Sequence, residues 1–300
     1  MPAVRSLDWR RLPRFRPGAY YTSFDAARGR TYNPGMTTDR NDPPVLFERG
    51  DKIATITLNR PQDGNRWTRD MLAAFEPVVE ALHRDENTHV VIVRGAGGEY
   101  FSWGAFDPAI RGAMDKQELV EFVLRGSRLR DSLEMVPQVV IAALNGKTRG
   151  NGGELALACD LRYVSERATL SFPEADMGGI PGGGGPARLP AVVGRARAIE
   201  LLCSGREVGA EEMVRIGFAL AAYPNERLLD EVTKIARRMA EKGPIALRGV
   251  KRIAHTRLAP GLREARWVSD ELRSKLEWSH DVDEAIAAHK EGRKPRFTGK

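Results

Sequence analysis

Long apolar segments are missing from this sequence. The longest apolar runs, around Val90–Val93 and Val139–Leu144, fall far short of the roughly 20 residues that a membrane-spanning helix requires. No apolar core of a secretion signal follows the first residues. Only two cysteines occur, Cys159 and Cys203, both in apolar helical surroundings without metal-ligand spacing. We therefore expect a cytoplasmic protein with no membrane partner and two buried free thiols.

Clusters of metal-binding side chains and runs of basic residues are also missing. None of the five histidines belongs to a group with ligand spacing, so the sequence predicts no metal site. The formal charge is +7, yet basic residues alternate with acids and never form a run of five. A solvated surface explains this charge better than a nucleic-acid partner, which needs a clustered basic face. The remaining alternatives are a small ligand that carries phosphate and, less favoured, nucleic acid.

Regular patterning begins only near residue 44. Residues 1–43 carry scattered arginines and prolines without periodicity, which indicates an extension outside the core. Its interspersed acids favour a flexible or partner-bound arm over an organellar transit peptide. Residues 44–222 alternate strands with helices, whereas residues 223–300 are helical throughout. The chain therefore reads as an α/β core followed by a helical region.

The core is expected to start with a hairpin and then to alternate buried strands with helices. Two alternating runs between Val45 and Asn59 predict the hairpin. Thr68 is a suitable N-cap for the helix that follows. β-branched runs predict the later strands, and Gly182–Gly185 must be a loop. The remaining expected segments are a strand at His89–Val93, a helix at Lys116–Met135, a strand at Val139–Leu144, and helices from Glu154, at Arg195–Ser204, Ala210–Ile216, Glu226–Glu241, Ile245–Thr256, Leu262–Leu276 and Val282–His289.

Two glycine turns stand beyond two of the buried strands and suggest a reaction site. One contains Gly104-Ala105 and the other Gly150-Asn151-Gly152. If the strands are neighbours, backbone N–H groups from both turns can converge on one oxygen atom and stabilise an oxyanion, each donor being worth about 100- to 1,000-fold in rate. Glu154 and Glu174 follow, and paired carboxylates are suited to moving protons between carbon and water.

Five segments, taken in order, resemble the enoyl-CoA hydratase or crotonase family. They are LNRPQDGN, FSWGAFD, ALNGKTRGNGGELALACDLRYVSERATLSFPE, MGGIPGGGGPARLPAVVG and AAHKEGRKPRF, and the resemblance covers residues 45–298. It implies a spiral of ββα units with C-terminal helices that mediate trimerisation, as a homotrimer or a dimer of trimers. It also implies an acyl-coenzyme A substrate and no permanently bound cofactor, so the basic charge would meet the phosphates of coenzyme A.

Position by position, the resemblance places the two oxyanion N–H groups on Ala105 and Asn151, and the two hydratase carboxylates on Glu154 and Glu174. The chain departs from the family pattern at three positions. Asn151 replaces a glycine and brings a side chain into the site. Trp103 and Phe106 replace a small residue and an aspartate beside the first turn. The expected pocket is completed by the residues Trp103, Gly104, Phe106, Gly150 and Gly152.

A hydratase reaction fits this pattern, and other reactions of the family are the alternative. The pair of glutamates favours a hydratase that adds water across the 2,3-double bond of a 2-enoyl-CoA in fatty acid or aromatic acid metabolism. The bulky Trp103 and Phe106 leave another reaction of the family open, either double-bond isomerisation or hydrolysis of a carbon-carbon or thioester bond. The sequence does not assign acid and base between Glu154 and Glu174, so they are treated as a coupled pair.

Overall fold

A computed structural model describes residues 42–105, 112, 114–244, 246–252, 254, 255, 270, 274, 277–293 and 295. Residues 1–41 of the expected extension, the pocket residue Phe106 and all but two residues of the expected helix Leu262–Leu276 lie outside this description.

A six-stranded sheet forms the centre of the molecule. The expected hairpin is confirmed: β1 (Val45–Arg49) pairs antiparallel with β2 (Ile53–Leu58). The other strands run parallel to β2, in the order β1-β2-β3-β5-β7-β10. They are β3 (Val90–Gly95), β5 (Val139–Leu144), β7 (Leu161–Ser165) and β10 (Ala222–Tyr223). The β-branched runs are buried on both faces of this sheet, as expected for parallel strands.

A second, four-stranded sheet was not expected from the sequence. Its order is β4-β6-β8-β9, formed by β4 (Tyr100–Ser102), β6 (Lys147–Arg149), β8 (Thr169–Ser171) and β9 (Val208–Gly209). Strands of two or three residues are too short to show an alternating pattern. The glycine turns therefore follow the short strands β4 and β6 and not, as the sequence suggested, the long buried ones. Each pair of a long and a short strand leads into a helix, which gives the expected spiral of ββα units.

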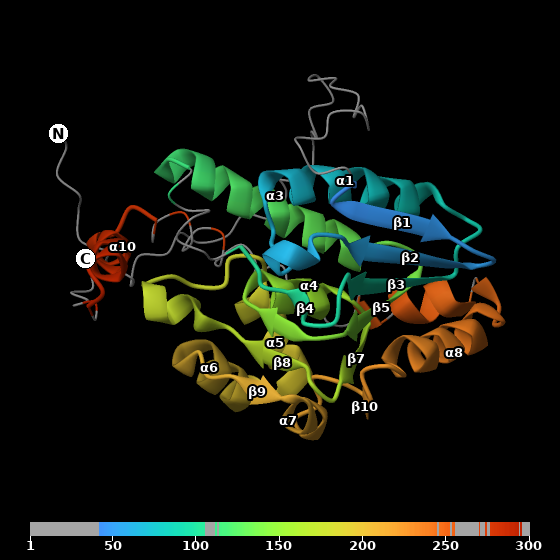
Figure 1. Ribbon diagram of the computed structural model, residues 1–300. Helices are drawn as coiled ribbons and strands as arrows, with labels where there is room; N and C mark the ends of the chain where they lie inside the picture. Colours follow the sequence, from blue (N-terminus) through green and yellow to red (C-terminus); the bar gives the residue numbers. More distant parts are fainter. Residues whose placement is uncertain are drawn as a thin grey trace, which may run out of the picture.

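Helices cover both faces of the six-stranded sheet (Figure 1). On one face α1 (Arg69–Arg84) and α3 (Lys116–Glu134) pack on alternate residues such as Val91 and Val93. On the other, α8 (Leu228–Ala240) packs on Val90 and Ile92. The N-caps are local: Thr68 Oγ1 accepts the N–H of Met71, and Asp115 with Glu118 forms a capping box.

The remaining α-helices lie between β6 and β10 in the chain, except for α10, which lies near the C-terminus. The α-helices are α4 (Asn151–Ala158), α5 (Gly185–Val193), α6 (Arg195–Ser204), α7 (Ala210–Arg215) and α10 (His280–Lys290), and the 3-10 turns are η1 (Pro61–Asp63) and η2 (Pro173–Met177). Figure 1 shows α10 in red, far from α8, and α10 contacts η2. Among the described residues, no helix combines the length and apolarity needed to cross a membrane.

The two cysteines differ, which corrects the expectation that both are buried. Cys159 is buried, and this burial, reinforced by the charge of Asp160, raises the pKa of its thiol to about 12. Cys203 is exposed, because α6 buries Ala198 and Leu201 and turns Cys203 away from that face.

Candidate active site

The two glycine turns lie against each other. Strands β4 and β6 pair in parallel, with Ser102 opposite Thr148, so both chains leave the sheet at the same edge. Gly104 has a φ of 82°, and a Cβ atom there would lie 2.5 Å from the carbonyl oxygen of Arg149 and 3.1 Å from the backbone nitrogen of Asn151. Only glycine allows this approach. The fold thus brings Ala105, the next residue, and Asn151 to adjacent turns.

Helix α4 begins at Asn151, three residues before the start expected at Glu154. Gly150 is its N-cap, with a φ of 50°, and the N–H of Glu154 donates to the carbonyl of Gly150 over 3.0 Å. From the sequence, Gly152 and Gly153 were expected to continue the turn, but they lie in the first turn of the helix. Glycine is needed at both positions because the surrounding packing leaves no space for a side chain. A methyl group at Gly152 would overlap the carbonyl of Ser102, and one at Gly153 would lie 2.8 Å from the ring of Phe172.

Glu154 is fully buried and is held by N–H donors. Its Oε1 accepts the backbone N–H of Gly185 over 2.8 Å, and its Oε2 accepts the side-chain amide of Asn151 over 2.5 Å. Gly183 lies directly over this pair, because a methyl group there would overlap Oε2. Among the described residues Glu154 forms no ion pair, so dipoles and not an opposite charge stabilise this carboxylate.

Glu174 reaches the same turn from the other side. It stands in the first turn of η2, after Pro173, and only 2% of its surface is exposed. Its Oε1 lies where a side chain at Gly150 would project. The N–H of Gly150 donates to the carbonyl of Ser171, at the end of β8, over 2.9 Å. The short strands β6 and β8 therefore set the distance between Glu174 and the start of α4. Glu174 lies beside Gly150, the N-cap of this helix, and Glu154 binds the side chain of Asn151, its first residue.

Trp103 stacks beside the first turn. Its ring packs edge-on against Tyr100, with centroids 5.5 Å apart, and the guanidinium of Arg149 lies 5.0 Å from its centroid. Trp103 directly precedes Gly104, and Arg149 directly precedes Gly150. The stacking of Arg149 on Trp103 therefore joins the chain segments that follow β4 and end β6. Whether Trp103 also contacts the acyl group, as the sequence suggested, stays a prediction.

Arg188 is a residue of the site that sequence reasoning missed. It is 3% exposed, and its guanidinium binds Glu134 at 2.7 and 2.9 Å, Asp131 at 2.5 Å and the carbonyl of Gly183 at 3.3 Å. Burial alone would lower the pKa of Arg188, but these two acids outweigh it and raise the pKa above its ordinary value. Because Gly183 covers Glu154, Arg188 anchors the turn that encloses the carboxylate. The glycine run marked this turn in the sequence, but no signal marked the arginine.

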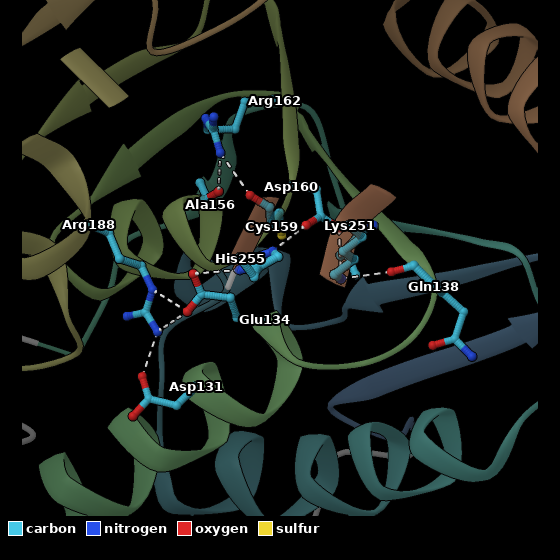
Figure 2. A network of polar contacts seen from close by, with 11 residues as sticks. Asp131, Glu134, Gln138, Ala156, Cys159, Asp160, Arg162, Arg188, Lys251 and His255 are labelled. Carbon is cyan, nitrogen blue, oxygen red and sulfur yellow. Dashed lines mark hydrogen bonds and ion pairs between the residues drawn. The ribbon is translucent and has the colours of Figure 1, made fainter. Parts of the chain in front are cut away.

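The contacts of Arg188 continue into a buried charged network, shown in Figure 2. His255 lies 3.8 Å from Glu134 and 3.1 Å from Asp160, and Lys251 binds Asp160 at 2.8 Å. Lys251 and His255 both come from the C-terminal helical region, which this network fastens to the core. His255 thus has a partner on each side. The described residues contain no cluster of His, Cys, Asp and Glu suited to a metal ion.

Comparison with known proteins shows the family of the chain. The family model for enoyl-CoA hydratase/isomerase matches residues 48–300. A crotonyl-CoA hydratase from Syntrophomonas wolfei is 33% identical over 85% of this chain and 98% of its own length. A short-chain-enoyl-CoA hydratase from Clostridium acetobutylicum is 30% identical, over 83% and 95% respectively.

Solved structures show the same fold. The crystal structure of an enoyl-CoA hydratase from Bacillus anthracis matches with a TM-score of 0.70 and 32% identity, covering 86% of this chain and all of that one. An enoyl-CoA hydratase from Mycobacterium avium matches with a TM-score of 0.75 and 28% identity, over 85% and 98%. The spiral of ββα units, the paired glycine turns and these matches lead to one conclusion: the chain belongs to the enoyl-CoA hydratase/isomerase family.

Proposed function

We propose that this protein is an enoyl-CoA hydratase, which adds water reversibly across the 2,3-double bond of a 2-enoyl-CoA. One observation supports the proposal: two buried carboxylates lie near the start of α4, Glu174 beside Gly150 and Glu154 beside the side chain of Asn151, next to the turn at Gly104. Relatives named as hydratases of crotonyl-CoA and short-chain enoyl-CoA support it. In this proposal coenzyme A is part of the substrate, no cofactor is permanently bound, and the chain assembles as a homotrimer or a dimer of trimers.

The backbone of the two turns would bind the thioester. The N–H groups of Ala105 and Asn151 would donate to the thioester oxygen, and the N-terminus of α4 adds its positive dipole end. As negative charge develops on this oxygen, the 2,3-double bond is polarised and C3 becomes electrophilic. The close packing of both turns through Gly104 would hold these donors in place before the substrate arrives.

The two glutamates would handle the water. One carboxylate accepts a proton while the oxygen of water forms a bond to C3. The π electrons of the double bond move towards the thioester and form an enolate, which the two N–H groups stabilise. The other carboxyl group then gives a proton to C2, and the thioester carbonyl is restored. The hydroxyl group of the water ends on C3 and the proton of the second carboxyl group on C2. The proton taken up by the first carboxylate then passes to the second, so the site is restored, one molecule of water is consumed in total, and the product is a 3-hydroxyacyl-CoA.

A product screen tests the proposal. The purified protein is given aliphatic and aryl 2-enoyl-CoAs in ¹⁸O-labelled water, and 3-hydroxyacyl-CoA with label at C3 is the expected product. Glu154→Gln and Glu174→Gln should each lower kcat by about 100- to 10,000-fold. Glu166→Gln is the matched control, because Glu166 is exposed and should leave the rate unchanged.

The same screen separates the alternatives. A shifted double bond without label would identify an isomerase, the reading that the bulky Trp103 beside the first turn leaves open. Release of free coenzyme A would identify thioester hydrolysis. If either glutamine variant retained full hydratase activity, the paired-carboxylate mechanism would be wrong.

A further inference from the structure

Asn151 departs from the glycine expected at its position, and its side chain has a place of its own. The residue opens α4, and Glu154 follows three positions later, so the two side chains lie on the same face of the helix. The amide of Asn151 donates to Glu154 Oε2 over 2.5 Å. Its side chain therefore turns along the helix towards the carboxylate, while its backbone N–H is left at the glycine turn.

The contact matters because Glu154 depends on few donors. One oxygen accepts the N–H of Gly185 and the other the amide of Asn151, and the described residues supply no ion pair. A buried carboxylate that loses one of two such donors is left with an uncompensated oxygen. It also loses the contact that fixes the plane of the carboxyl group, because a single hydrogen bond leaves the side chain free to rotate about it.

The surroundings leave Glu154 little room for another arrangement. Gly183 packs directly on Oε2 of Glu154. A Cβ atom added to Gly183 would also lie 3.1 Å from the amide nitrogen of Asn151. Arg188 holds the carbonyl of Gly183, and Arg130 on α3 lies 3.4 Å from the carbonyl oxygen of Asn151. Both the carboxylate and its amide donor are thus packed between α3 and the turn before α5.

We propose that the side chain of Asn151 is a positioning residue that orients the carboxylate of Glu154, while the backbone N–H of the same residue binds the thioester. This inference rests on the proposed hydratase function for its catalytic part. One residue then serves both halves of the reaction: its main chain stabilises the enolate, and its side chain holds one of the two groups that transfer protons. Glycine at this position would supply only the first.

Kinetics of two variants test the catalytic part. Asn151→Gly keeps the backbone N–H and removes the amide, so kcat should fall about 10- to 100-fold while KM changes less than about threefold. Asn151→Asp has the same shape but sets an acceptor against Glu154, and it should be slower than Asn151→Gly. The red shift in absorbance of a bound aryl enoyl-CoA reports thioester polarisation, and Asn151→Gly should retain it.

A double-mutant cycle separates positioning from a general structural effect. If Asn151 acts through Glu154, Asn151→Gly should slow the Glu154→Gln enzyme by less than about twofold, although it slows the unchanged enzyme at least tenfold. Equal losses in both backgrounds, or an Asn151→Gly enzyme with unaltered kcat, would overturn the proposal.

A second cycle requires no activity. Urea unfolding of the unchanged protein, Asn151→Ala, Glu154→Met and the double variant should show a coupling of about tenfold or more in the unfolding equilibrium constant, as expected for a buried hydrogen bond to a charged group. A coupling near one would contradict the contact itself. A protein that shows this coupling but hydrates no enoyl-CoA would instead refute the proposed function and leave the Asn151–Glu154 contact established.

Discussion

Glu154 and Glu134 are two largely buried carboxylates connected to one stretch of backbone, and they are stabilised differently. Glu154 accepts N–H groups from Gly185 and Asn151 and forms no ion pair within the described residues. Glu134 binds the guanidinium of Arg188, which also holds Asp131 and the carbonyl of Gly183. Two kinds of polar cluster therefore meet at the turn Gly183–Gly185.

The difference separates a group suited to chemistry from groups suited to support. A carboxylate held only by N–H dipoles has no charged partner to displace before it exchanges a proton. A carboxylate paired with a buried guanidinium is suited to support, because removal of either partner would leave an uncompensated buried charge. We infer that Glu154 is kept available for proton transfer, whereas the network of Figure 2 fixes the turn that encloses it.

The largest effect on stability is expected from removing the ion pairs of Arg188. Arg188→Met removes the guanidinium that binds Glu134 and Asp131 and should lower the free energy of unfolding by about 3–5 kcal/mol. It should also lower kcat, since the turn over Glu154 loses its anchor. Urea denaturation and hydration rates measure the two effects.

Two variants sharpen this result. Arg206→Met is the matched control, because the pairs of Arg206 with Glu200 and Glu212 are partly exposed and should contribute less than about 1 kcal/mol. Glu154→Gln should change the free energy of unfolding by only about 1 kcal/mol, because glutamine keeps one oxygen for the N–H of Gly185 and the Asn151 amide can rotate to accept a hydrogen bond. If Arg188→Met proved as stable as Arg206→Met, the network would not be the structural partner proposed here.

A smaller effect is expected from acid. Burial alone would raise the pKa of Asp160, but the hydrogen bond with His255 and the charge of Lys251 outweigh it and hold the pKa below its ordinary value of 3.8. The folded protein therefore binds this proton less readily than the unfolded chain. The stabilisation from Asp160 is complete above pH 3.8 and is lost as the pH falls through the lower folded-state pKa.

Asp160→Asn tests this dependence. The variant should be less stable than the unchanged protein near neutral pH, and the gap should narrow as the pH falls below 3.8, measured as urea midpoints across the acid range. A gap that stayed constant with pH would mean that the ionisation of Asp160 does not contribute.

The smallest expected effect is a difference in reactivity between the two cysteine thiols, which reports whether the core around Cys159 stays closed. Cys203 is exposed and should react with a disulfide reagent such as dithiobis(nitrobenzoate) within minutes. Cys159 neighbours Asp160, is buried and has a pKa raised to about 12, so it should react only after unfolding. One fast and one slow equivalent are expected, and Cys203→Ser should remove the fast one. If Cys159 reacted faster in Arg188→Met than in the unchanged protein, loss of the network would have opened the core.

Much of the fold was predictable because its signals are local. The hairpin between Val45 and Leu58 and the cap of α1 at Thr68 follow from residues a few positions apart, and both are confirmed. The predicted helix Arg195–Ser204 is confirmed at both ends. The short strands β4, β6 and β8 were missed because each depends on its neighbour in the second sheet rather than on its own sequence.

The start of α4 shows why local signals failed at the site. Gly152 and Gly153 have poor helix propensity, which suggested that the helix waits until Glu154. Both are helical because Ser102 and Phe172, distant in the chain, leave no space for a side chain there. Tertiary packing overrode propensity, and the earlier start is what places Asn151 one turn before Glu154.

The sequence by itself determined which chemical groups are available to the site. These are two glycine turns, two glutamates and a run of glycines, in the order that is typical of the family. Only the tertiary structure decided how these groups meet. It set the turns side by side through Gly104, joined Asn151 to Glu154, and tied Gly183 to Glu134 through Arg188. Local patterns record the conformation of a few successive residues, whereas contacts between residues some fifty positions apart arise only when the strands and helices pack.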